Sequence, residues 1–150
     1  MAAIERAHGL AAAGLSEARE AIAALRGDAL PGPERLPALL ETFGAGCTLT
    51  VTGEPAVLGS EARLAVYRTA QEALTNVRKH SLPESVDVRL EYAPDGTRLI
   101  VEDVGETVAA TNGRAGYGLT GMRERAELLG GRLRAGPTDA GFKVELWLPA

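Results

Sequence analysis

The segment that decides the fold is Tyr67–His80, with the sequence YRTAQEALTNVRKH, inside a helical pattern that runs from Ser60 to His80. The apolar residues of this pattern fall on one arc, and they are Val66, Ala70, Ala73, Leu74 and Val77. That spacing is typical of a helix that buries one side against a core. Ser60 is predicted to cap the N-terminus of the helix, because its hydroxyl can accept a backbone N–H there.

Four polar residues also lie close together on this predicted helix, namely Glu72, Asn76, Lys79 and His80. At about 100° per residue they share roughly a quarter of the circumference, next to the apolar arc. We therefore expect them at the rim of the core, where a ligand would be partly shielded from water. The alternative interpretation is a solvated helix face that binds nothing.

The rest of the chain predicts a sheet and several further helices. We expect strands at 47–52, 86–92, 98–103, 132–135 and 142–148, and helices at 4–25, 34–43 and 118–129. The turn chemistry of residues 93–96 indicates a hairpin, and Gly130-Gly131 indicates the end of a helix. These elements predict an α/β (α+β) two-layer sandwich, in which helices cover one face of a mixed, mostly antiparallel sheet, with an additional N-terminal helix.

Glycines gather around the predicted loop at 104–117. Asp103 and Gly105 are expected to end a strand and open this loop, and Gly116, Gly118 and Gly121 precede and enter the next helix. Glycines let phosphate oxygens approach backbone donors, and the first N–H groups of a helix have no partner within it. The cluster therefore indicates a polyphosphate site, although a flexible turn would use the same residue type.

Composition limits the classes of function. The chain has 150 residues, a formal net charge of −4 and 45% hydrophobic residues. This charge lacks the basic surplus that neutralises a nucleic-acid backbone, so we expect no nucleic-acid partner. The one cysteine, Cys47, suits a reducing cytoplasm. The sequence shows neither a secretory signal nor a long apolar run, so we expect a cytoplasmic fragment without a membrane segment.

Three blocks of sequence carry a family resemblance. Tyr67–His80 resembles the asparagine box of sensor histidine kinases of the nitrate-sensor and DesK-like class. Val101–Gly105 (VEDVG) resembles the first glycine box of that family. Gly116–Arg125 (GYGLTGMRER), followed by Leu128–Gly131 (LLGG), resembles the second. The resemblance requires three separate motifs in the family's order across residues 46–150, which makes it specific.

The resemblance implies the ATP-binding, Bergerat-type fold shared by histidine kinases, DNA gyrase and mismatch-repair ATPases, with ATP and Mg²⁺ as cofactors. Asn76 would hold the Mg²⁺ that bridges the phosphates, and Asp103 would accept a hydrogen bond from the adenine amino group. An asparagine carbonyl is a hard oxygen ligand, and a carboxylate accepts from an amino group but not from a carbonyl. Further nucleotide contacts would come from Lys79, His80, Gly105, Gly116, Gly118, Leu119 and Gly121.

The candidate catalytic residues are Glu72 and Asn76, and the role of Glu72 is ambiguous. In the related ATPases, a glutamate four residues before the asparagine activates water, whereas a histidine kinase must suppress hydrolysis. We interpret Glu72 as a candidate base or a polar positioning residue. Phosphoryl transfer depends mainly on placement and charge neutralisation, so loss of Asn76 should harm activity more than a change at Glu72.

Three positions qualify the resemblance. Family members usually carry a glycine where this chain has Thr107, and often a threonine where it has Phe142 after Gly141. Both changes bear on nucleotide affinity. His8 is followed by Gly9 and not by an acidic residue, so we interpret it as a structural residue of a helix. The acceptor histidine is therefore expected to lie outside this chain.

The predicted domain organisation has three parts: a partial second dimerisation helix at 1–27, a linker with a short helix at 28–45, and the ATP-binding domain at 46–150. The implied function is transfer of a phosphoryl group from Mg-ATP to a histidine and onward to an aspartate of a response regulator. Expected partners are ATP, a dimerisation helix that bears the histidine, the response regulator, and a second copy in a homodimeric parent. Two alternatives stay open: a degenerate regulatory module on the same fold, and an ATPase or anti-sigma-factor-like serine kinase.

Overall fold

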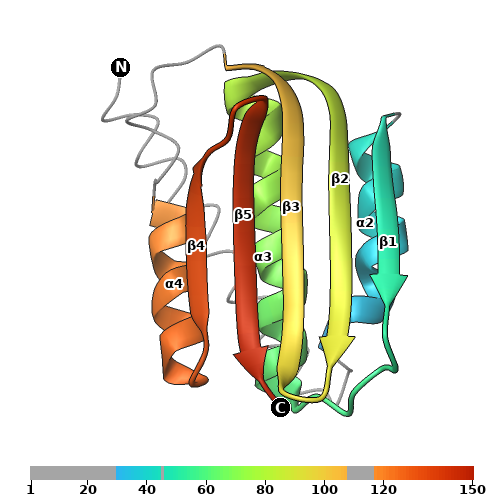
Figure 1. Cartoon of the computed structure of the whole chain (residues 1–150), viewed down its shortest axis with the longest axis vertical. Coiled ribbons are helices and arrows are strands. Elements are labelled where there is room, and N and C mark those ends of the chain that lie inside the picture. Colours follow the sequence, from blue (N-terminus) through green and yellow to red (C-terminus); the bar gives the residue numbers. More distant parts are fainter. Residues whose placement is uncertain (1–29, 45, 108–116) are drawn as a thin grey trace.

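A five-stranded mixed sheet forms one layer of the molecule, and helices form the other (Figure 1). The computed structural model describes residues 30–44, 46–107 and 117–150. The elements in chain order are a 3-10 turn (η1, Pro33–Arg35), α2 (Leu36–Phe43), β1 (Cys47–Thr52), α3 (Ser60–His80), β2 (Ser81–Ala93), β3 (Gly96–Thr107), α4 (Tyr117–Leu128), β4 (Arg132–Pro137) and β5 (Gly141–Pro149).

The strands lie in the order β1-β2-β3-β5-β4. The β1 and β2 strands are parallel, and the other three neighbouring pairs are antiparallel. The α2, α3 and α4 helices all lie behind the sheet in the view of Figure 1, and the other face has no cover among the described residues. The predicted fold class, a mostly antiparallel sheet with helices on one face, is confirmed.

The core lies between the two layers. Alternate residues of the central strands are buried against the helices: Val86, Val88 and Leu90 on β2, Leu99 and Val101 on β3, and Val144, Leu146 and Leu148 on β5. The predicted apolar arc of α3 packs on them, and each of its residues is buried: Val66, Ala70, Ala73, Leu74 and Val77. Apolar residues that recur every second position on the strands therefore pack against apolar residues that recur about every 3.6 positions on the helix, and together they form one apolar layer.

The helix boundaries follow local chemistry. Gly59, and not the predicted Ser60, is the residue whose carbonyl accepts the first helical N–H of α3, from Arg63 at 2.9 Å, so the predicted cap was misplaced by one residue. The α4 helix ends as predicted, at Gly130-Gly131. The N–H of Gly131 donates to the Ala126 carbonyl at 2.8 Å and Gly130 has φ of +80°, a conformation that favours glycine.

All four strands after β1 are longer than predicted, β2 and β3 by the most. The β2 strand begins at Ser81, directly after α3, where we expected it to begin at 86. The β3 strand continues to Thr107, so Asp103 and Gly105 do not end a strand and open a loop. Instead, Gly105 pairs with Pro83 and donates its N–H to the Ala140 carbonyl at 2.9 Å. Pairing partners on both sides keep this stretch extended.

Arg78 joins α3 to the short helix before it. Its Nη2 atom donates to the carbonyls of Thr42 at 3.2 Å and Phe43 at 2.9 Å, and its guanidinium lies 5.0 Å from the Phe43 ring centre. These carbonyls are at the C-terminal end of α2, where a cation is favourable. The contact fixes the C-terminal end of α3 on the α2 side.

The predicted helix at 4–25, with His8, lies outside the described residues. The short helix expected at 34–43 is present as η1 and α2. None of the described helices is both long and apolar enough to cross a membrane.

Candidate functional site

Two elements that carry predicted site residues, the α3 helix and the β3 strand, end at the same end of the molecule (Figure 1). The α4 helix begins on the side of α3 away from α2, at some distance from that end (Figure 1). The α3 helix contacts β3, β5 and α4. The predicted site residues lie on these three elements: Glu72, Asn76, Lys79 and His80 on α3, Asp103 and Gly105 on β3, and Gly118, Leu119 and Gly121 on α4. Segments far apart in the sequence thus converge where the candidate site was expected.

Asp103 is buried near the end of β3. It alternates with Leu99 and Val101 on β3, so it shares their helix-covered face, and only 1% of its surface is exposed. Its Oδ1 atom accepts a hydrogen bond from the backbone N–H of Phe142 at 3.1 Å. A carboxylate in an apolar layer is expensive unless its oxygens have partners. Its position is therefore held by the neighbouring strand.

Gly141 permits the close approach of β5 to Asp103. An ideal Cβ atom on Gly141 would lie 2.5 Å from Asp103 Oδ1 and closer still to the Asp103 carbonyl oxygen. In the sequence this glycine stood out only as the residue before Phe142, and its close approach to Asp103 was not predicted. The signal available in the sequence was a glycine at the start of the last predicted strand, which is typical of close backbone approach.

Asn76 lies on the flank of α3 that faces α4. Arg78 contacts α2, and at about 100° per residue Asn76 lies roughly 160° around the helix from Arg78. In Figure 1, α2 and α4 lie on opposite sides of α3. Asn76 and Glu72 are both half-buried, which confirms the expected rim position, whereas Lys79 is exposed. An amide and a carboxylate thus lie on the side of α3 toward α4.

The first turns of α4 carry the predicted second glycine box. The Leu119 side chain is 2% exposed and belongs to the core, so any contact of this residue with a ligand would use its backbone. Gly121 is different, because among the described residues a Cβ atom there would meet no heavy atom within 4 Å outside its chain neighbours and the helix's own backbone. Packing against the described residues therefore does not explain a residue that costs about 1 kcal/mol relative to alanine inside a helix.

The donor set suits a nucleotide-bridged Mg²⁺ better than an all-protein metal site. No group of three or more His, Cys, Asp or Glu residues that could hold a metal occurs within the described ranges. Mg²⁺ commonly takes one or two protein oxygens and completes its shell with phosphates and water. The half-buried Asn76 amide fits that pattern.

Two predicted site residues are not fully described. Gly116 lies outside the described residues, and the side chain of His80 at the end of α3 is not described. The same holds for the side chain of Thr107 at the end of β3. A shallow depression does occur elsewhere, lined by Arg134, Gly136, Lys143 and Glu145 among others, on the uncovered face of β4 and β5. It is separate from the residues predicted to bind nucleotide.

Comparison with known proteins identifies the family. A family model described as "Histidine kinase-, DNA gyrase B-, and HSP90-like ATPase" matches residues 61–150, which include α3, all the strands after it and α4. The chain belongs to this family. The resemblance to its sensor histidine kinase branch, including the nitrate-sensor class, is confirmed by the curated relatives.

Two of these relatives are much longer than this chain. The chain is 33% identical over 110 residues to the signal transduction histidine-protein kinase/phosphatase UhpB of Salmonella typhimurium, and the match covers 73% of this chain and 22% of UhpB. It is 31% identical over 116 residues to the nitrate/nitrite sensor protein NarQ of Escherichia coli, covering 75% of this chain and 20% of NarQ. The chain thus spans about a fifth of the length of each.

A solved structure shows the same fold. The histidine kinase domain of the blue-light activated histidine kinase from Erythrobacter litoralis aligns with a TM-score of 0.57 and 21% identity, covering 75% of this chain and 56% of that one. At this identity the likeness concerns the fold alone.

Proposed function

We propose that this chain supplies the nucleotide site of a sensor histidine kinase, which transfers the γ-phosphoryl group of Mg-ATP to a histidine outside this chain. A response-regulator aspartate would then accept the group. Membership of the ATPase family and similarity to named sensor kinases support ATP as the ligand. The assignment to particular residues rests on the burial of the Asp103 carboxylate on the sheet face that the helices cover, and on the half-buried position of Asn76 on α3.

Asp103 binds the adenine end in this proposal. Its carboxylate accepts from the 6-amino group of adenine, and it would repel the 6-oxo group of a base such as guanine or hypoxanthine. Burial strengthens the discrimination, because repulsion between the carboxylate and a 6-oxo group is weakly screened in an apolar layer. Gly105, farther along β3, leaves space beside the base.

Asn76 binds the phosphate end. Its side-chain oxygen would be a ligand for Mg²⁺, a cation that would neutralise charge on the phosphates. Lys79 adds a positive charge nearby, and His80 orients its neighbours. The N-terminus of α4, with Gly116, Gly118, Leu119 and Gly121, offers backbone N–H groups to the phosphates.

The transfer itself requires placement more than covalent chemistry from this chain. A deprotonated histidine nitrogen attacks the γ-phosphorus, the bond to the bridging oxygen breaks, and ADP leaves with the electron pair. Residues of this chain bind and orient ATP for that in-line attack. Glu72, one turn before Asn76, acts as a polar positioning residue or as a base.

The remaining parts of the proposal concern the parent protein. Residues 1–27 form part of the second dimerisation helix, residues 28–45 link it to the ATP-binding domain at 46–150, and the parent is a homodimer. ATP is a cytoplasmic metabolite, so the chain works on that side of any membrane to which the parent is anchored.

A transfer experiment tests the proposal. The chain is mixed with γ-labelled ATP, Mg²⁺ and a separate dimerisation segment that bears an acceptor histidine, and acid-labile, base-stable phosphate is measured on the segment. We expect label on the segment, none when its histidine is replaced by glutamine, and none with the Asn76→Ala chain.

Two other outcomes would contradict the kinase proposal. Steady release of inorganic phosphate without label on the segment would indicate an ATPase. Absence of ATP binding by the folded chain, measured by calorimetry, would indicate a regulatory module that keeps the fold and has lost the nucleotide.

A further inference from the structure

Asp103 contacts the start of β5, a segment that lies outside the three sequence motifs. Asp103 is 1% exposed. Its Oδ1 atom accepts a hydrogen bond at 3.1 Å from the backbone N–H of Phe142, a residue 39 positions farther along the chain. The contact uses the main chain of Phe142 and not its side chain. Any residue other than proline at position 142 can therefore make it.

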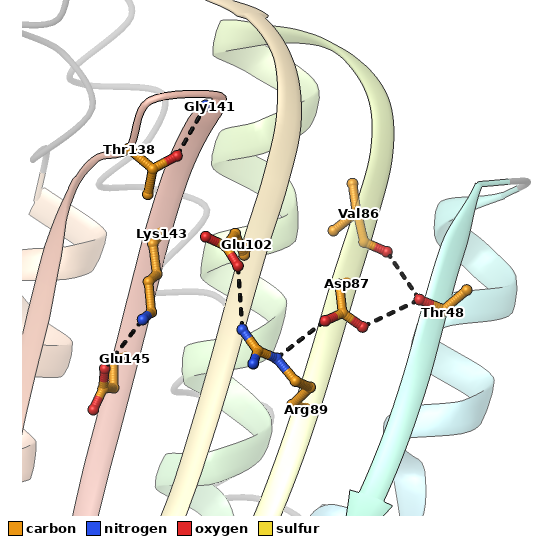
Figure 2. Close-up of polar contacts among 9 residues, drawn as sticks. All are labelled: Thr48, Val86, Asp87, Arg89, Glu102, Thr138, Gly141, Lys143 and Glu145. Atoms are coloured by element: carbon orange, nitrogen blue, oxygen red, sulfur yellow. Dashed lines mark hydrogen bonds and ion pairs between the residues drawn. The ribbon is translucent and has the colours of Figure 1, made fainter.

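The turn between β4 and β5 fixes the residue before this donor. The Gly141 N–H donates to Thr138 Oγ1 at 2.9 Å, and the Gly141 carbonyl accepts the Thr138 N–H at 2.8 Å (Figure 2). On the β3 side, the Gly105 N–H donates to the Ala140 carbonyl at 2.9 Å. Hydrogen bonds on both sides thus hold Gly141 against Asp103.

Gly141 must lack a side chain for this packing. A Cβ atom there would lie 2.5 Å from Asp103 Oδ1 and 2.8 Å from the Asp103 carbonyl carbon. The atoms it would meet are mainly backbone of a central strand, which cannot move away as a flexible side chain can. Any larger residue would push β5 from Asp103 and lengthen the bond from the Phe142 N–H.

We propose that Gly141 and the backbone N–H of Phe142 are positioning groups for base selection, which fix the Asp103 carboxylate in the orientation that accepts the 6-amino group of adenine. The inference rests on the proposed nucleotide site. It assigns the selectivity for adenine to a strand contact as well as to the carboxylate. It also explains how a chain with phenylalanine at position 142 keeps its carboxylate anchored.

The ratio of ITP to ATP dissociation constants tests this inference, because the two nucleotides differ only in the 6-amino group of ATP, which ITP replaces by a 6-oxo group with a proton on the neighbouring N1. The unmodified chain should bind ATP roughly tenfold or more tightly than ITP, since a hydrogen bond to a charged group is at stake. Gly141→Ala should bring the ratio close to one. Gly136→Ala should leave it unchanged, because this residue lies on the neighbouring strand and a Cβ atom there would meet no heavy atom of the described residues within 4 Å.

A backbone substitution isolates the hydrogen bond if Gly141→Ala does not fold. Phenyllactic acid in place of Phe142 keeps the side chain and replaces the N–H by an ester oxygen. The matched control carries the corresponding hydroxy acid in place of Val144, two residues along β5 and on the same face. The ester at 142 should remove the preference for ATP, and the ester at 144 should keep it.

The outcomes separate this inference from the proposed function. Failure of the unmodified chain to bind ATP would overturn both. If the unmodified chain prefers ATP, Asp103→Asn removes the preference, and the 142 ester retains it, then Asp103 selects the base without the strand contact. That result would overturn the inference and leave the nucleotide site in place. A merely structural contact would weaken ATP and ITP binding equally, so the ratio would not change.

Discussion

The two faces of the sheet use charged residues in different ways. On the uncovered face, Arg89 pairs with Asp87 and Glu102 at 3.0 and 3.1 Å, and Arg98 pairs with Glu145 at 3.1 Å. Figure 2 shows the side chains of the first of these groups extending across neighbouring strands. On the helix-covered face, Asp103 is the charged member of the buried residues in the described ranges.

The charged residues of the two faces therefore differ in what they contribute to stability. The ion pairs of the uncovered face are partly exposed, and such pairs contribute little to stability. A carboxylate beneath the helices is costly, and an apolar residue at the same place would fill the core more cheaply. The burial of Asp103 therefore agrees with its proposed role in nucleotide binding.

The largest expected effect compares neighbours on opposite faces of β5. Leu146→Ala should lower the free energy of unfolding by about 2–5 kcal/mol, because it leaves a cavity in the core. Glu145→Gln, one residue away on the uncovered face, should lower it by less than about 1 kcal/mol. Urea denaturation of both variants measures this. Similar losses for the two would show that the faces do not differ as described.

A smaller effect is expected at the edge of the helix layer. Arg78→Ala removes two hydrogen bonds to the end of α2 and the contact with Phe43. The free energy of unfolding should fall by about 1–2 kcal/mol. Arg78→Lys should recover only part of it, because an ammonium cannot reproduce the planar guanidinium. Thermal unfolding compares the three proteins, and a full recovery by lysine would refute the proposed geometry.

The ion pairs of the uncovered face should matter less still. Arg89→Met keeps most of the aliphatic stem and loses the contacts with Asp87 and Glu102. We expect a loss of about 0–1 kcal/mol at low ionic strength that disappears near 1 M salt, where charges are screened within about 3 Å. A loss that persists in high salt would mean that packing, and not charge, supplies the contribution.

The smallest predicted effect concerns Cys47 on β1. Burial, and secondarily the charge of Asp87, raises the pKa of its thiol above the usual value. The folded state therefore holds the thiol proton more tightly than the unfolded state does. The resulting contribution to stability is present below the unfolded pKa and is lost as pH rises through the folded pKa. Alkylation by iodoacetamide should show its midpoint at higher pH in the native protein than in urea, and a lower native midpoint would contradict this.

Periodic patterns allowed most of the fold to be predicted. The apolar arc of α3 and the alternation at 86–92 depend on burial of one side, which local sequence records. The ends of β2 and β3 were harder, because Pro83 and Gly105 are typical of strand ends. In the structure these two residues pair with each other, at a register irregularity after Pro83. A pairing partner is a long-range property that no local window contains.

The candidate site was only partly predictable. The motifs brought Asn76 and Asp103 to attention, and the structure carries their elements to the same end of the molecule. Their roles in binding stay predictions. Gly141 was missed, because its importance comes from a close approach to a residue on another strand. Sequence shows that a side chain is absent there but not which atoms occupy the space.

The central claim is that Asn76 and Asp103 hold opposite ends of one nucleotide. Calorimetric titration with ATP and ITP, each with and without Mg²⁺, tests it on Asn76→Ala, Asp103→Asn and the control Glu102→Gln, whose side chain lies on the uncovered face. Asn76→Ala should lose the Mg²⁺ dependence and keep the preference for ATP, Asp103→Asn should do the reverse, and Glu102→Gln should keep both. If the Asn76 and Asp103 variants lose the same property, or neither loses any, the two residues do not hold opposite ends of the ligand.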